Sequence, residues 1–570
     1  MVPGWMLERA AARRLAGDWR GACAVAGVDV EVDLRALRRV HGAEVADRVE
    51  DDLRHLVPDL LRWRMPRRRD GLLEVARHYP LGFFPDGHAL VARPPVWWDR
   101  PQRITLRFER LDGTSTGRRD DAFVLLRDRW DSRCTAEALN RCGGVDRLPF
   151  FTRAGERLPE ALVGGQGAEG LVERAVRLDD GGRPAAAWGA AGFRLEVLLF
   201  DPRWGRERID PAAFDPHLAI GERNRVRGEA VRRSLAWLRP VHTTLADAAR
   251  RVRAFHAERR RTAPWDEAAW DGPEWVADVD EDCGLARIDV RGRCLVLDGL
   301  DTDRPRVRLV VGAPYGEADE ERRRAEVAEF GVELARVPRI PHELARRPAE
   351  LTDPDGAHPL VRAALFPEAP PLPPPAPPVL RERVRVHCDQ ATHEVVMRDG
   401  AVVLAHTQMS ITREKLLKAL GGQLQGCVAA RDGWRDPAVR MPRPMRVLRA
   451  DLLALVRRGD GPAVAAALDR GLDPHVRDEQ GRTLLHLLPW LLGADLLPRL
   501  LAVGLRLDAR DERGETPLHT AVEVGPVDLV RALVAAGADP RARADGPWGR
   551  MPLSTNRPEL AFLRDHWPGR

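Results

Sequence analysis

The spacing of apolar positions predicts helices at the start of the chain. Residues 7–26 and 33–56 show helical periodicity. One apolar face of the second stretch is marked by Leu34, Leu37, Val40, Val45, Val49, Leu53 and Leu56.

The period then changes to two. Apolar residues of 103–109 alternate with polar and charged ones, which predicts a half-buried strand. Other predicted elements are weaker strands at 72–79 and 88–92, helices near 121–131 and 135–141, a basic helix at about 243–261, a hairpin of 285–290 with 294–297, a strand at 307–311 and a charged helix from about 317. The stretch 150–220 is punctuated by Gly and Pro. The first 366 residues therefore predict an α+β fold.

Eight prolines between residues 367 and 378 separate this part from the rest. Such a run favours an extended, semi-rigid spacer and marks a domain boundary. We predict a multidomain protein with an α+β domain at 1–145, a partly irregular α+β domain at 146–366, a Pro-rich linker at 367–380, a small sheet-and-helix domain at 381–440 and an all-α repeat region at 441–570.

The small domain has a hairpin signal at Asp399-Gly400. A two-residue turn there places Met397 opposite Val402, and His393 opposite His406. A four-residue turn at 389–392 places Cys388 opposite His393. These two turns predict a three-stranded antiparallel sheet with one apolar face, which a helix at 412–420 would cover.

Cys388, His393 and His406 then lie abreast at one end of this face, and Cys427 follows the covering helix. Two thiols and two imidazoles suit tetrahedral zinc. The spacing matches no known zinc-finger pattern, and a Cys–His nucleophile pair or a structural role as a buried thiol and hydrogen-bonded imidazoles are alternatives. We expect no other cofactor.

Three glycines, Gly471, Gly504 and Gly537, recur at intervals of 33 residues in the C-terminal part. A second series runs in step: Gly481, Thr483 and His486 recur as Gly514, Thr516 and His519. The best copy reads Gly514-Glu-Thr516-Pro517-Leu518-His519, with Gly537 at its end. This region resembles ankyrin repeats, over about residue 448 to the end. The rest of the chain resembles no characterised family.

The resemblance implies about three and a half units, each a turn and two helices, with atypical capping units at both ends. It assigns structural roles to Thr483, His486, Gly504, Thr516, Pro517, Leu518, His519 and Gly537. Positive φ is expected at Gly504 and Gly537. Leu484 stands where the pattern has proline, and Leu488-Pro489-Trp490 is unusual inside a first helix.

The resemblance also implies a protein partner, bound at the turn tips and the concave face. The tips here are Arg477, Asp478, Glu479 and Arg482, then Arg510, Asp511, Glu512 and Arg513. Arginine and acidic residues balance over 448–570, with 17 of each, so this surface does not favour nucleic acid. Support of a neighbouring domain is the alternative role of the stack.

Composition changes this picture little. A net charge of +5 on 570 residues does not by itself indicate nucleic acid. Seven cysteines without a Cys-x-x-Cys pair argue against a disulfide framework, and no stretch predicts a membrane span or signal peptide. We expect a cytoplasmic protein. The only two lysines, in a chain rich in Arg, indicate a GC-rich bacterial genome.

Two other functions stay open. The segment 222–261, with 12 Arg against four acids, is a candidate phosphate-contacting surface. An enzyme within 1–360 is the second, although its motifs, a Gly-x-Ser-x-Gly at 113–117 and a Gly-x-Gly-x-x-Gly at 165–170, lack the expected context. No catalytic residue is therefore assigned, and the favoured function is that of an adaptor.

Overall fold

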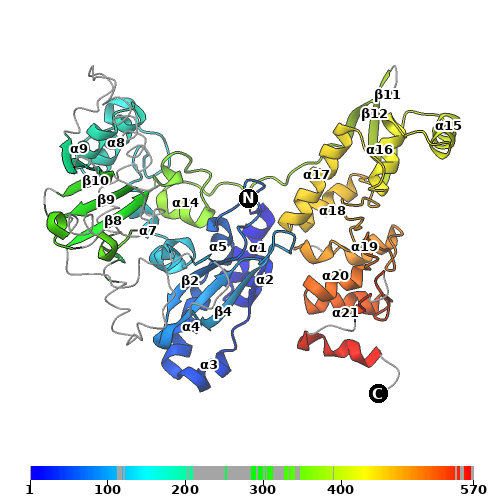
Figure 1. Cartoon of the computed structure of the whole chain (residues 1–570), viewed down its shortest axis with the longest axis horizontal. Coiled ribbons are helices and arrows are strands. Elements are labelled where there is room, and N and C mark those ends of the chain that lie inside the picture. Colours follow the sequence, from blue (N-terminus) through cyan, green and yellow to red (C-terminus); the bar gives the residue numbers. More distant parts are fainter. Residues whose placement is uncertain are drawn as a thin grey trace.

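The computed structural model describes the greater part of the chain. The described residues are 2–111, 118–119, 122–201, 205–209, 249, 251–252, 254, 284–290, 293–299, 302, 305–311, 327–332, 334–340, 347–388, 391–493, 495–545, 549–552 and 557–566. Helices and small sheets alternate along it, and the C-terminal part is helical (Figure 1).

The N-terminal part packs helices on a five-stranded sheet of order β1-β4-β3-β2-β5. Its helices are α1 (Gly4–Leu15), α2 (Trp19–Val25), α3 (Leu34–His41), α4 (Ala43–His55) and α5 (Pro58–Arg64). Its strands are β1 (Val28–Val30), β2 (Arg77–Phe83), β3 (His88–Arg93), β4 (Ile104–Arg110) and β5 (Arg118–Arg119). The predicted strands at 88–92 and 103–109 are confirmed.

Some of the predicted helix and strand boundaries were wrong. The helix predicted over 33–56 is two helices, because Gly42 between them has φ +88°, a left-handed conformation that ends a helix. Val40 is 73% exposed and leaves the apolar face. The strand expected at 72–79 begins only at Arg77. The helix expected at 121–131 is the single turn α6 (Ala122–Leu125), followed by 3₁₀ turns, and α7 is Glu137–Arg141.

A second five-stranded sheet has the order β7-β6-β10-β9-β8. Its strands are β6 (Arg194–Asp201), β7 (Gly205–Ile209), β8 (Leu285–Val290), β9 (Arg293–Asp298) and β10 (Arg306–Val311). The helices α8 (Ala168–Asp180) and α9 (Pro184–Ala190) share its core, and α14 (Pro359–Leu365) packs with α8 in a separate core. The predicted pairing of β8 with β9 and the strand β10 are confirmed. The helix expected from 317 lies outside the described residues, as does all of the Arg-rich segment 222–261 except 249, 251, 252 and 254.

The proline-rich stretch carries no helix or strand, and residues 370–379 are exposed. It leads from α14 past the N-terminus to the third sheet (Figure 1). It also touches α1, since a Cβ added at Gly4 would lie 2.6 Å from the carbonyl oxygen of Pro375.

The third sheet has the order β11-β12-β13, formed by β11 (Arg383–Cys388), β12 (Ala391–Arg398) and β13 (Ala401–Val403). The helices that follow are α15 (Gln408–Ala419), α16 (Gly426–Arg435), α17 (Arg443–Arg458), α18 (Gly461–Asp469), α19 (Leu497–Ala502), α20 (Pro517–Val524) and α21 (Val527–Ala535), with 3₁₀ helices η10 (Leu488–Trp490) and η12 (Pro558–His566). One hydrophobic core runs from Leu380 through the sheet and the stack to Leu563. The third sheet therefore caps the start of the stack.

The sheet is fastened to the stack at the Asp399-Gly400 turn. The Gly400 amide donates to the carbonyl oxygen of Gly471 (3.2 Å), which follows α18. From α16, the Trp434 indole N–H donates to the Asp473 carbonyl at 3.0 Å. These bonds tie both layers of the cap to the end of one helix.

The stack also contacts the N-terminal part. The Trp5 indole N–H donates to Asp460 Oδ1 at 2.9 Å, and Arg9 donates to the Gly493 carbonyl at 2.7 Å. Leu492 is buried in the N-terminal core rather than in the core of the stack. Arg100 pairs with Glu523 at 2.6 Å. Figure 1 accordingly shows α1 and α2 beside the stack.

Candidate functional sites

Four side chains from separate elements converge at one end of the third sheet. Cys388 ends β11, His393 lies in β12, His406 follows β13 and Cys427 lies in the first turn of α16. One donor atom of each lies within 4.8 Å of the others. Cys427 is fully buried and the other three are partly buried.

The contacts in this cluster are close. Sγ of Cys388 lies 3.1 Å from Sγ of Cys427, and Nδ1 of His393 lies 3.0 Å from Nε2 of His406. Sγ of Cys427 lies 3.8 Å from Nδ1 of His393. Two sulfur and two nitrogen donors facing one point are a chemically competent set for a borderline-soft cation.

The predicted register was right for one pair of strands and wrong for the other. Met397 faces Val402, as predicted. Cys388 pairs with Ala391 and His393 with Val386, so the β11–β12 register is shifted by two residues. β12 begins at Ala391, inside the four-residue turn that was predicted at 389–392. Because side chains alternate with a period of two, an even shift leaves the same residues on the same face.

The prediction that a helix at 412–420 covers the sheet was also wrong. In α15 only Ile411 is buried, and Leu416, Leu417 and Leu420 are 62%, 53% and 84% exposed. The apolar face of the sheet packs instead on α16 and α17, whose residues Cys427, Trp434, Met445, Leu448 and Leu452 share its core. The helices α16 and α17 cover the sheet because their apolar residues line one side of each helix, while those of α15 do not.

The ankyrin units are joined by buried histidines. The Thr483 amide donates to His486 Nδ1 (3.1 Å), and His486 Nε2 donates to the Glu515 carbonyl in the next unit (3.0 Å). His519 repeats this pattern with Thr516 and the carbonyl of Arg550. Burial lowers the pKa of His486 to about 4 and lowers that of His519. Neutral rings therefore bridge the units.

The glycines that end the units have positive φ, as was predicted for Gly504 and Gly537. Gly471, Gly504 and Gly537 have φ of +92°, +88° and +101°. Pro517 begins α20, and Leu518 is fully buried, so these motif residues are structural parts of the third unit.

Five of the eight predicted tip residues, Arg482 among them, hold the turns together. Arg477 donates to the carbonyls of Gly481 and Arg510, and Arg510 does the same one unit later to Gly514 and Arg543. Asp478 accepts from the amides of Gln480 and Arg482 and from the Arg482 side chain. Asp511 accepts from the amides of Arg513 and Glu515.

The other tip residues face solvent: Glu479, Glu512 and Arg513 are exposed, as is Gln480 between them. Beside the tips of the second unit lies a cleft of about 170 Å³, lined by Trp98 and Asp99 from the N-terminal part and by Glu479, Gln480 and Trp490 from the stack, among others. Trp98 and its neighbour Trp97 are 49% and 62% exposed. No sequence pattern indicated this loop, because only the tertiary structure brings it to the tips.

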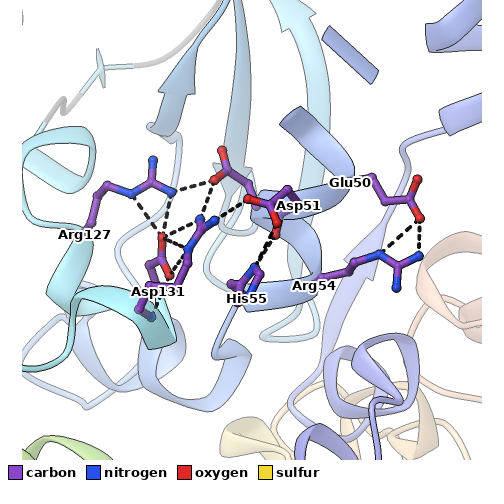
Figure 2. A network of polar contacts seen from close by, with 8 residues as sticks. Glu50, Asp51, Arg54, His55, Arg127 and Asp131 are labelled. Carbon is purple, nitrogen blue, oxygen red and sulfur yellow. Dashed lines mark hydrogen bonds and ion pairs between the residues drawn. The ribbon is translucent and has the colours of Figure 1, made fainter. Parts of the chain in front are cut away.

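A charged network between α4 and the segment 127–133 was also missed (Figure 2). Arg127 and Arg133 bind the two buried carboxylates Asp52 and Asp131. His55 and Asp51 lie at its edge. These arginine contacts outweigh the burial of Asp131 and lower the pKa of its carboxyl. Each acid has its cation, so the network fastens two segments together.

Glu350 forms a second buried cluster. Its carboxylate pairs with Arg64 and with Arg141, which also binds Asp128. Although Glu350 is buried, these arginines lower the pKa of its carboxyl. The cluster joins α5, α7 and the segment before α14.

Of the two enzyme motifs, the one at 113–117 falls in residues that the structure does not describe. The glycines at 165–170 are preceded by a 3₁₀ turn, Glu160–Leu162, instead of a strand, and lead into α8. A dinucleotide-binding loop joins a strand to a helix, so this motif has a different context.

Comparison with known proteins supports the sequence resemblance. A family model described as ankyrin repeats (three copies) matches residues 452–544. The C-terminal region of the chain therefore consists of ankyrin repeats, which generally mediate protein–protein interaction. No curated protein matches the chain. Among the described helices, none has the length and apolar character needed to cross a bilayer.

Proposed function

We propose that this protein is an adaptor that binds a protein partner where the ankyrin turn tips meet the loop 96–100, called here the tryptophan loop. The observation that carries the proposal is the cleft between Trp98 and the tips of the second unit. These tips lie inside the region that matches ankyrin repeats, and Trp98 comes from the N-terminal part. Solvent-accessible tryptophans beside a cleft are typical anchors for a partner's side chain.

The charges around the cleft favour a partner of mixed polarity. Glu479 and Glu512 are exposed on successive tips, with Arg513 beside the second. Among the residues that line the cleft, three are acidic, Asp99, Asp478 and Glu479, and two are basic, Arg457 and Arg482. A peptide segment with an apolar residue and flanking basic groups complements such a surface.

Support of the neighbouring part is not an exclusive alternative. The contacts with the N-terminal part use Asp460, Leu492, Gly493 and Glu523, while Glu479 and Glu512 stay exposed. We infer that the ion pair of Arg100 with Glu523 in the third unit positions the tryptophan loop, and that the tips bind the partner. The stack would then serve both roles.

The division into domains at 1–145 and 146–366, the Pro-rich linker at 367–380 and a cytoplasmic bacterial location belong to this proposal. The segments 381–440 and 441–570, which the sequence predicted as separate domains, form one domain in it. The location rests on the cysteines: all six described ones are free thiols, as is usual in a reducing compartment. The single core from Leu380 to Leu563 argues that the last two segments fold as one unit.

The test starts with the full chain as bait, followed by purification of the recovered protein and calorimetric titration. We expect Trp98→Ala, and separately the pair Glu479→Arg and Glu512→Arg, to weaken binding at least tenfold, which is about 1.4 kcal/mol.

Leu15→Ala is the matched apolar control, since Leu15 is 89% exposed on α1. Asp528→Arg, on the exposed start of α21, is the charge control. Controls that weaken binding as much as the test variants, or test variants that bind normally, would remove the proposed surface.

A further inference from the structure

We propose that Cys388, His393, His406 and Cys427 bind one structural zinc ion that fastens the base of α15 to the third sheet. Their four donor atoms, two thiol sulfurs and two imidazole nitrogens, lie within 4.8 Å of one another. Neither the ankyrin repeats nor the interaction surface includes these residues.

The distances fit a tetrahedral ion. Zn–S bonds of about 2.3 Å and Zn–N bonds of about 2.0–2.1 Å place neighbouring donors roughly 3.3–3.8 Å apart. The sulfur–sulfur distance is 3.1 Å, the nitrogen–nitrogen distance 3.0 Å and one sulfur–nitrogen distance 3.8 Å. Seating a single ion among them would lengthen the sulfur–sulfur and nitrogen–nitrogen distances by roughly 0.3–0.7 Å and would shorten the widest donor separation by at most about 1 Å.

The backbone around the cluster donates a hydrogen bond to one of the two sulfurs. The Cys427 amide donates to Sγ of Cys388 at 3.0 Å, the kind of bond that orients and stabilises a metal-bound sulfur. This approach needs Gly426, because a Cβ added there would lie 2.4 Å from the same Sγ. Gly426 also has φ +54°, which a side chain would strain.

Four protein donors leave no open coordination position, so the site is structural and not catalytic. Its purpose follows from the position of the ligands. His406 and Cys427 bracket α15, of which only Ile411 is buried. Apolar packing therefore holds this helix weakly, and a metal joining both of its flanks to β11 and β12 would supply the missing restraint.

The first test is metal content. We expect the full chain, expressed with zinc and purified under a non-chelating reductant, to contain one zinc per chain by elemental mass spectrometry. Exchange with Co²⁺ should give the intense visible absorption of tetrahedral cobalt and a sulfur-to-cobalt charge-transfer band.

A folded, reduced wild-type chain without stoichiometric zinc and without these bands would overturn the proposal. So would a native Cys388–Cys427 disulfide, detected by intact mass, in chain that carries no metal.

Ligand variants locate the ion. Cys388→Ser and His406→Asn should lower zinc content from one per chain to well below one half. The matched controls are Cys134→Ser, a half-buried free thiol elsewhere, and His387→Asn, the exposed neighbour of Cys388. Full zinc content in both ligand variants would place the ion elsewhere and contradict the assignment.

The lysines supply a readout that needs no variant. Lys415 and Lys418 are the only lysines of the chain, and both lie on α15. A lysine-specific protease therefore cuts only there, and cleavage requires α15 to open locally. We expect removal of zinc by a chelator to speed cleavage at least tenfold, and added Zn²⁺ to restore resistance. Equal cleavage rates with and without zinc would refute the restraint on α15.

Discussion

The second ankyrin unit, residues 481–504, and the third, residues 514–537, share their glycines, their Thr–x–x–His pair and the bond from histidine to the next unit. They differ in the first helix. The third unit forms α20, whereas the second forms only turns and the 3₁₀ helix η10. Pro489 has no amide N–H to continue a helix, and no proline stands at the equivalent position 522.

The irregular unit is the one that contacts the N-terminal part. Leu492 occupies the position of Gly525 in the third unit, and its side chain enters the N-terminal core. A Cβ added at Gly27 would lie 2.7 Å from it. The second unit thus combines an irregular first helix with a contact between two parts of the chain, and it has the same histidine bridge as the third unit.

Substitution of two adjacent leucines gives the strongest test of the contact between the second unit and the N-terminal part. Leu491 is buried in the core of the stack and Leu492 in the N-terminal core. Leu492→Ala and Leu491→Ala should each lower the free energy of unfolding by about 2–5 kcal/mol, and each should weaken the core from which its side-chain atoms are removed. By hydrogen exchange, Leu492→Ala should raise amide exchange in α1 and α2, and Leu491→Ala in the stack. The same exchange pattern in both variants would mean that Leu492 does not separate the two cores.

The histidine bridges should make the stack acid-sensitive. A histidine whose folded pKa is lowered contributes stability above its unfolded value of about 6.5, and this contribution is lost as pH falls toward the folded value. For His486, with a pKa lowered to about 4, the loss is about 3 kcal/mol.

Urea unfolding between pH 7.5 and 4.5 measures this loss. His486→Gln should flatten the pH dependence more than His519→Gln does. If the free energy of unfolding of His486→Gln depended on pH as that of the wild type does, the His486 bridge would not be the source of the acid sensitivity.

The stability that is lost when a unit-ending glycine is replaced by alanine should depend on the atoms that surround the glycine. Alanine at Gly504 or Gly537 should cost about 1–2 kcal/mol, because both have a left-handed φ and nothing lies within 4 Å of an added Cβ.

Gly471→Ala should cost more, since its Cβ would lie 2.7 Å from the Asp399 amide nitrogen. Thermal unfolding of the three variants under one condition gives the order. Equal losses would show that the cap is not tightly docked there.

The candidate metal cluster was partly predictable. The sequence placed Cys388, His393 and His406 on one face, and an even register shift preserved that grouping. Cys427 was proposed because it follows a helix, but that helix was expected to cover the sheet, and α15 does not. The cleft at Trp98 was unpredictable, because its walls come from parts about 380 residues apart in the sequence.

What the sequence alone determined is local: the period of 33 residues, the left-handed glycines, the Asp399-Gly400 hairpin and the strands at 88–92 and 103–109. Each depends on backbone preferences and side-chain spacing within a few residues. The tertiary structure decided which apolar surface meets which: α16 over the sheet, Leu492 in the N-terminal core and Arg64 with Arg141 on Glu350. Burial is non-directional, so only the assembled shape selects its partners.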